Sequence, residues 1–192
     1  MKFGIVRLQV QSEPLKTGKA PLRQYDPSAI ESVHRLEVTP SGVVGLAEQL
    51  GSVLDVHHTD HPMSRDRKGT AGLTLMGTGD YVRLQERYGN HLTEGIAGET
   101  ILLDAPEGLA GLDLPTAITV HTRRGPLQLT RVRVANPCVE FSRFCLRQPP
   151  EATVNEDVEQ ALIDLAGGAR GYRAAAAAFG TIGLGDQVEV AR

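Results

Sequence analysis

Residues 116–135, TAITVHTRRGPLQLTRVRVA, are the stretch that decides the fold class of this chain. They contain many β-branched residues in alternating or short apolar runs that Gly125 and Pro126 separate, a pattern that favours strands. Further short runs of this kind lie at 36–45, 71–76, 99–104 and 180–191. Strands at such short intervals, with few helices between them, predict a mainly β (α+β) protein. We expect a closed antiparallel β-barrel with a few peripheral helices.

The composition supports many short strands over a helical bundle. Of the 192 residues 41% are apolar, only 4% are aromatic, and there are 21 Gly and 11 Pro. The length suits one domain with an appendage. We expect residues 1–29 to form an N-terminal strand and an irregular arm packed on the barrel, and residues 30–192 to form the barrel domain.

Two helices are predicted from their end signals. Thr78 is placed to cap a helix that runs to Gly89, and Asn155 is placed to cap a helix over 156–166 with acidic residues in its first turn.

Charge and patterning exclude several classes of partner. Lys and Arg total 20 against 23 for Asp and Glu, a net charge of −3, so no basic excess indicates nucleic-acid binding. The first ten residues lack the pattern of a signal peptide, and no apolar run is long enough for a membrane span. We expect a cytoplasmic protein with no nucleic-acid or membrane partner.

Cys138 is the candidate reactive residue. It follows Asn136-Pro137, and proline is suited to ending a strand and presenting the next side chain. Alternation in the preceding strand places Arg131 and Arg133 on one face, where guanidinium charge would favour the thiolate that attacks sulfur or binds a soft metal. The alternative is a buried structural cysteine.

The second cysteine, Cys145, has a simpler interpretation. It lies in an apolar segment, 139–146, that we interpret as a strand or turn, so we expect a small core residue. Two cysteines do not make a disulfide framework, and a four-ligand zinc site needs more sulfur or a well-spaced histidine pair.

A histidine cluster, HHTDH at 57–61, has the outer spacing of the H-E-x-x-H zinc motif. His58 replaces the catalytic Glu, and Asp55 and Pro62 argue against a helix. A solvated loop is therefore favoured over a zinc hydrolase that would use His57, Asp60 and His61.

Four stretches, in order, resemble the MOSC family, named for the C-terminal domain of molybdenum-cofactor sulfurase. They are 36–45 (LEVTPSGVVG), 92–102 (LTEGIAGETIL, near G-x-x-G-E-N-[IL]), 135–138 (ANPC) and 168–190 (RGYR…GTIGLGDQVEV). Two positions depart from the family pattern: Leu46 replaces Asp, and Thr100 replaces Asn. The departures predict weakened cofactor retention with the fold unchanged.

The resemblance implies a MOSC-type barrel, with a strand over 174–178 despite the helix propensity of its alanines. It implies that Cys138 either carries activated sulfur for molybdenum-cofactor maturation or binds molybdenum in a reductase of N-hydroxylated compounds. A pterin phosphate needs positive charge, so the charged run at 64–69 is either solvated or part of the cofactor site. The residues implied to converge on Cys138 are Arg67, Lys68, Glu99, Thr100, Arg131 and Asn136.

The implied partners are molybdopterin or a small-molecule substrate, together with a separate cysteine desulfurase or electron-donor protein. The competing hypothesis is a noncatalytic barrel that binds a pterin-like ligand or a protein partner without turnover.

Overall fold

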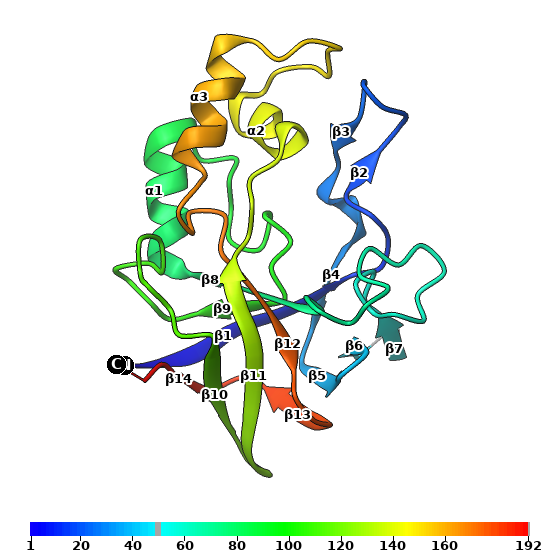
Figure 1. Ribbon diagram of the computed structural model, residues 1–192, viewed down its shortest axis with the longest axis vertical. Coiled ribbons are helices and arrows are strands. Elements are labelled where there is room, and N and C mark those ends of the chain that lie inside the picture. Colours follow the sequence, from blue (N-terminus) through cyan, green and yellow to red (C-terminus); the bar gives the residue numbers. More distant parts are fainter. Residues whose placement is uncertain (49–50, 192) are drawn as a thin grey trace.

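The computed structural model describes residues 1–48 and 51–191. Figure 1 shows most of the strands in one half of the molecule and the helices over one end of them, with β2 and β3 in the same half as the helices. The strands are β1 (Lys2–Gln11), β2 (Lys16–Thr17), β3 (Gln24–Tyr25), β4 (Ile30–Val33), β5 (Arg35–Thr39), β6 (Gly42–Ala47), β7 (Gly51–Leu54), β8 (Leu73–Gly77), β9 (Ile101–Leu103), β10 (Ala117–Thr122), β11 (Gly125–Val134), β12 (Tyr172–Ala176), β13 (Gly180–Gly183) and β14 (Gln187–Glu189). The helices are α1 (Thr78–Tyr88), α2 (Val139–Leu146) and α3 (Glu156–Asp164), with a 3₁₀ turn at Pro27–Ala29.

A closed barrel forms the centre of the fold, as the strand pattern predicted. The strand order is β14-β10-β11-β12-β8-β9-β1, and β1 pairs with β14 to close it. One pair departs from the antiparallel expectation: β8 and β9 run parallel, so the barrel is mixed. A parallel pair requires a crossover connection, and α1 lies within it.

A smaller sheet in the order β13-β5-β6-β7 packs beside the barrel. Side chains of both sheets belong to one core cluster, which includes Leu36, Val38 and Val43 from the small sheet and Leu73, Ile101 and Leu129 from the barrel. β5 alternates between exposed and buried residues, so one of its faces contributes to this core.

The N-terminal strand β1 is one of the strands of the barrel. β1 pairs with β9, β14 and β4, so the barrel begins at Lys2 and not near residue 30. Residues 12–29 do leave the barrel, as an arm with one short hairpin of β2 and β3. Tyr25 anchors the arm on α2, with its ring centroid 5.0 Å from that of Phe141 and 5.1 Å from that of Phe144.

Two of the helices match the sequence prediction and one corrects it. Asn155 caps α3, since its side chain accepts the Val158 N–H at 3.0 Å. In α1 the N-cap is Gly77 and not Thr78, and Asp80 reaches back to accept the Gly77 N–H at 3.0 Å. Residues 139–146 are a helix and not a strand or turn.

α2 packs one apolar face into the core. Phe141 and Cys145 stand four positions apart, so a helix puts both on one buried face. Of the expected strand over 174–178, the first three alanines lie in β12, which ends at Ala176. Among the residues described, no helix has the length and apolarity that crossing a membrane requires.

Candidate functional site

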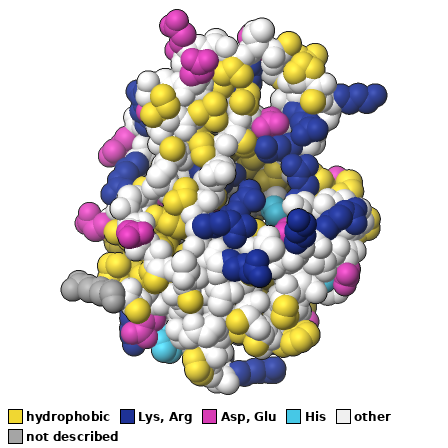
Figure 2. Space-filling model, viewed as in Figure 1, with side chains coloured by type: hydrophobic (Ala, Val, Ile, Leu, Met, Phe, Trp, Pro, Cys, Tyr) yellow, Lys and Arg dark blue, Asp and Glu magenta, His cyan; other side chains and the backbone are white. Residues whose placement is uncertain are grey.

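A cleft of about 290 Å³ lies between the N-terminal arm, the 55–70 loop and the segment that joins β11 to α2. Figure 2 shows Lys and Arg side chains gathered around a hollow on this face. The cleft is lined by Gln11, Pro14, Leu15, Lys16, Tyr25, His57, Arg65, Thr74, Ala97, Gly98, Ala135, Asn136, Pro137, Cys138, Arg170 and Arg173.

Cys138 is half-buried in this cleft and is the N-cap residue of α2. Its backbone is extended, with φ −142°, and its carbonyl accepts the Ser142 N–H at 3.0 Å. Cys138 thus stands at the start of the helix, although its side chain makes no capping hydrogen bond. Cys145 is 1% exposed, and burial raises the pKa of its thiol to about 12, so this cysteine is the core residue that the sequence predicted.

Positive charge dominates the lining. Lys16 pairs with Glu140 at 3.0 Å, but Arg65, Arg170 and Arg173 make no ion pair within the described part of the chain. No carboxylate of the described residues lines the cleft with them. Three guanidinium groups at one small cleft, without acidic partners, form a site for an anion.

Two of these arginines interact closely with their surroundings. The Arg170 guanidinium lies 4.1 Å from the centroid of the Phe141 ring, a cation–π contact that fixes its position. Partial desolvation, and then the like charges of Arg170 and Arg133, lower the pKa of Arg173. An anion bound between these groups would relieve that repulsion.

Glu99 lies behind the cleft and not in its lining. It is 1% exposed, and its Oε2 accepts a 2.6 Å hydrogen bond from the Tyr81 hydroxyl. Its Oε1 has no hydrogen-bond partner among the described residues. Burial raises the pKa of Glu99 to about 7, against the opposing effects of Tyr81 and Arg170.

Thr100 is also buried behind the wall of the cleft. Its Oγ1 lies 3.2 Å from that of Thr74, and its backbone N–H donates to Thr74 Oγ1 at 2.9 Å. Thr74 lines the cleft, so Thr100 shapes the wall through its neighbour. Its hydroxyl is engaged within the sheet.

The structure brings together only some of the six residues expected around Cys138. Asn136 lines the cleft beside it. Arg67 and Lys68 are exposed on the 55–70 loop and do not line the cleft, whereas Arg65 from the same charged run does. Arg131 is also exposed outside the lining.

A β-bulge explains the position of Arg131. The register of β11 against β12 shifts between Thr130 and Arg133, and Arg131 has φ +55°. The bulge breaks the alternation assumed for this strand, and Val134 is exposed although Val132 is buried. Leu46, the other departure from the family pattern, is half-buried in β6 opposite Arg35, away from the cleft lining.

Several lining residues were not predicted from the sequence. Lys16 and Tyr25 belong to the arm, where no periodicity marked them. Arg173 ends the RGYR segment of the 168–190 stretch, in which it was given no role. From the sequence, Arg170 in the same RGYR segment is expected either to bind phosphate or to pair with an acid. The adjacent Gly171 has φ +85°, and a Cβ there would clash with the Leu75 carbonyl oxygen, so a glycine is needed where the chain passes this close to β8.

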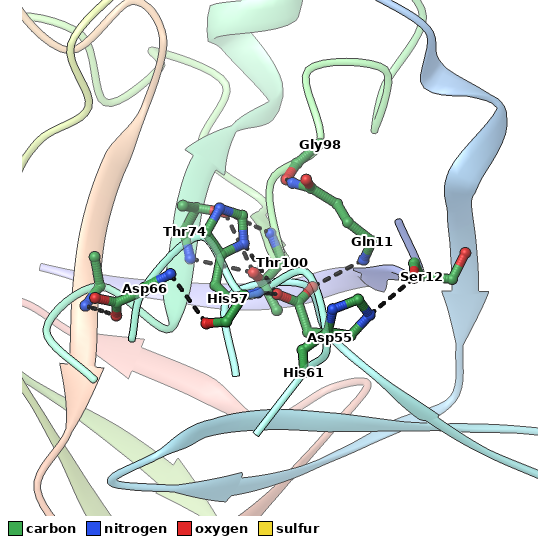
Figure 3. A network of polar contacts seen from close by, with 11 residues as sticks. Gln11, Ser12, Asp55, His57, His61, Asp66, Thr74, Gly98 and Thr100 are labelled. Carbon is green, nitrogen blue, oxygen red and sulfur yellow. Dashed lines mark hydrogen bonds and ion pairs between the residues drawn. The ribbon is translucent and has the colours of Figure 1, made fainter. Parts of the chain in front are cut away.

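The 55–70 loop is ordered by its own histidines and acids, which corrects the expected solvated loop. Figure 3 shows the Asp55 carboxylate accepting hydrogen bonds from the N–H groups of Gln11 and His57, both at 2.8 Å. His61 is buried, with Nε2 3.1 Å from the Ser12 carbonyl oxygen. Among the described residues, no group of three or more His, Cys, Asp or Glu side chains is placed to hold a metal ion.

The similarity of this chain to known proteins lies in its fold and not in its sequence. No protein-family model matches the chain, and no curated protein matches its sequence. The structure is similar to that of the YuaD protein from Bacillus subtilis, with a TM-score of 0.58 and 12% identity over 99% of this chain and 96% of that one. It is also similar to YiiM from Escherichia coli, with a TM-score of 0.56 and 13% identity over 100% of this chain and 70% of that one. This chain therefore has the β-barrel fold of YuaD and YiiM.

Proposed function

We propose that this chain is a MOSC-type protein that binds the molybdenum cofactor in the Cys138 cleft and reduces N-hydroxylated compounds. The observation that carries the proposal is the set of three arginines without carboxylate partners around a half-buried thiol. The motif order at 36–45, 92–102, 135–138 and 168–190, and the fold shared with YuaD and YiiM, support the family assignment.

The residues present fit such a cofactor. A thiolate sulfur is a soft ligand suited to molybdenum, and guanidinium groups bind phosphate oxygens in pairs of hydrogen bonds. The cleft volume of about 290 Å³ is near the lower end of ordinary small-molecule sites. Cys138 would hold the metal, with Arg65, Arg170 and Arg173 as the candidates for binding the phosphate.

The bound cofactor would supply two-electron chemistry at its metal. The protein's part is to fix the ligand sulfur at the start of α2, to neutralise phosphate charge and to position the substrate beside the metal. Arg170, held on the Phe141 ring, is a preorganised anion contact. Electrons would come from a separate electron-donor protein. We expect this chain and its electron donor to be cytoplasmic.

A second candidate function is sulfur carriage, which the half-buried thiol of Cys138 in the cleft supports. The Cys138 thiolate would attack the outer sulfur of a persulfide on a separate cysteine desulfurase. A new S–S bond then forms on Cys138, the old S–S bond breaks, and the donor cysteine leaves as a thiolate.

The test is anaerobic purification from a host that makes the cofactor, followed by molybdenum analysis and intact mass. We expect near one molybdenum per chain, lost in Cys138→Ser and retained in Cys145→Ala. A mass increase of one sulfur atom on Cys138, with no metal, would establish the carrier instead. Absence of both would leave the noncatalytic barrel and contradict both functions.

A further inference from the structure

His57 occupies a position in the cleft that the proposed cofactor site does not use. Its side chain lines the cleft together with Cys138, but it comes from the 55–70 loop, whereas Cys138 comes from the β11–α2 connection. A ligand bound in the cleft would therefore share it with a thiol and an imidazole.

The imidazole is held in one orientation by a buried carboxylate. His57 Nδ1 lies 3.0 Å from Asp55 Oδ1, and Asp55 is 1% exposed. The same Oδ1 accepts the His57 backbone N–H at 2.8 Å, and Oδ2 accepts the Gln11 N–H at 2.8 Å. Three contacts thus fix the carboxylate, and the carboxylate places a proton on Nδ1. Figure 3 shows this pairing at the centre of the loop's polar network.

The other ring nitrogen remains available. Within the described residues, His57 Nε2 has no hydrogen-bond partner, and Nδ1 and the backbone N–H account for all of its polar contacts. His61 of the same loop differs, because both of its ring nitrogens have partners. Its Nε2 lies 3.1 Å from the Ser12 carbonyl oxygen, and its Nδ1 accepts the Met63 N–H at 3.1 Å. His61 is therefore a structural residue of the loop, and His57 alone of the two faces the cleft.

We propose that His57, oriented by Asp55, is the proton-transfer residue of the cleft and contacts the bound ligand through Nε2. The arrangement is that of a base or acid within reach of a ligand, held by a third group behind it. The catalytic role of His57 rests on the proposed reductase function. The contact between Nε2 and an anion in the cleft is independent of that function.

In the reductase reaction the proton has a defined destination. Cleavage of the N–O bond of an N-hydroxylated substrate consumes two electrons from the external donor and two protons, and it yields the N–H product and water. The imidazolium of His57 gives its Nε2 proton to the departing oxygen, and solvent supplies the second proton. His57 is left neutral with its proton on Nδ1, the form that Asp55 stabilises.

The first experiment uses the protein without its cofactor. Imidazole ¹⁵N NMR should show neutral His57 with its proton on Nδ1. Added molybdate should shift the Nε2 signal of His57, but not that of His61, towards the imidazolium value, because an oxyanion accepts a hydrogen bond only from a protonated Nε2. In Asp55→Asn the proton should move to Nε2, because an amide can donate to Nδ1. An unmoved His57 signal, or equal shifts at His57 and His61, would overturn the contact.

The second experiment uses the loaded protein and an amidoxime with a chemical reductant. His57→Gln should retain molybdenum but lose turnover by about 100-fold, the usual scale of general acid catalysis, with kcat falling more than KM. His61→Gln is the matched control, and the folded variant should turn over at the wild-type rate. Full turnover in His57→Gln would contradict the assignment. Failure of the wild type to bind molybdenum would contradict the proposed function and leave the NMR result to decide on His57.

Discussion

The Tyr81 hydroxyl donates a 2.6 Å hydrogen bond to Glu99 Oε2 in the interior of the molecule, beneath the cleft that contains Cys138. Because burial raises the pKa of Glu99 to about 7, the folded protein holds a proton there that the unfolded chain releases near pH 4.5. The contribution to stability is complete below pH 4.5 and declines as the pH rises to about 7.

Glu99→Gln should remove that pH dependence. The difference between the two pKa values corresponds to about 3 kcal/mol of unfolding free energy in all, most of which is lost between pH 5 and pH 8. Urea denaturation at both pH values should show this loss in the wild type and a nearly flat response in the variant. Glu94→Gln, at an exposed position, is the control and should behave like the wild type.

The two cysteines should differ in their reaction with an alkylating reagent. Cys138 is half-buried at the cleft, whereas Cys145 is buried with a thiol pKa of about 12, so only Cys138 should react in the native protein. Mass spectrometry of the digested protein after a short exposure at pH 7.5 measures both sites. Equal labelling before unfolding, or faster labelling of Cys145, would refute the assignment.

Arginines that line the cleft should govern anion affinity, and those outside it should not. Arg173→Gln and Arg170→Gln should each weaken phosphate or molybdate binding by about tenfold, the value of one charge-assisted contact. Arg67→Gln changes the net charge equally at an exposed site outside the lining and should have little effect. Isothermal titration at low and high salt separates a direct contact from general charge, and equal losses in all three variants would indicate general charge alone.

Asp80 should contribute more to stability than Thr78, which the sequence indicated as the helix cap. The buried carboxylate of Asp80 accepts N–H groups of Gly77, Leu109 and Ala110 at 2.9–3.0 Å. Asp80→Ala leaves these donors without partners and should cost about 3 kcal/mol, against about 1 kcal/mol for Thr78→Ala. Thermal unfolding of both variants gives the comparison, and a smaller loss for Asp80→Ala would be inconsistent with this network.

The sequence predicted the barrel because strand patterning repeats along most of the chain, and β10 with β11 shows it most clearly. It predicted the helix at 156–166 because Asn155 and the acids after it are local signals. The parallel β8–β9 pair could not be predicted in this way, since strand direction depends on the path of the intervening chain. The length of α2 and its helical form were missed because eight residues with two phenylalanines and a cysteine fit either period.

The site was predicted in part for a related reason. Cys138 and Asn136 share one short segment, so a local pattern was enough to find them. The other lining residues come from the arm, the 55–70 loop and β12, and only the closed barrel brings these together. Arg131 was placed by an alternation that the bulge at Thr130–Arg133 interrupts, and no residue in that strand signals the bulge.

The pairing of β1 with β14 has a consequence for how the chain folds. Lys2 lies opposite Glu189, and the Met1 amino group donates to the Val190 carbonyl oxygen at 2.7 Å across a separation of 189 positions. During synthesis, the edge of β1 that pairs with β14 stays unpaired until β14 has left the ribosome. Closure at that seam is the step with the greatest loop entropy, and a chaperone that shields the edge of β1 would act on this interval.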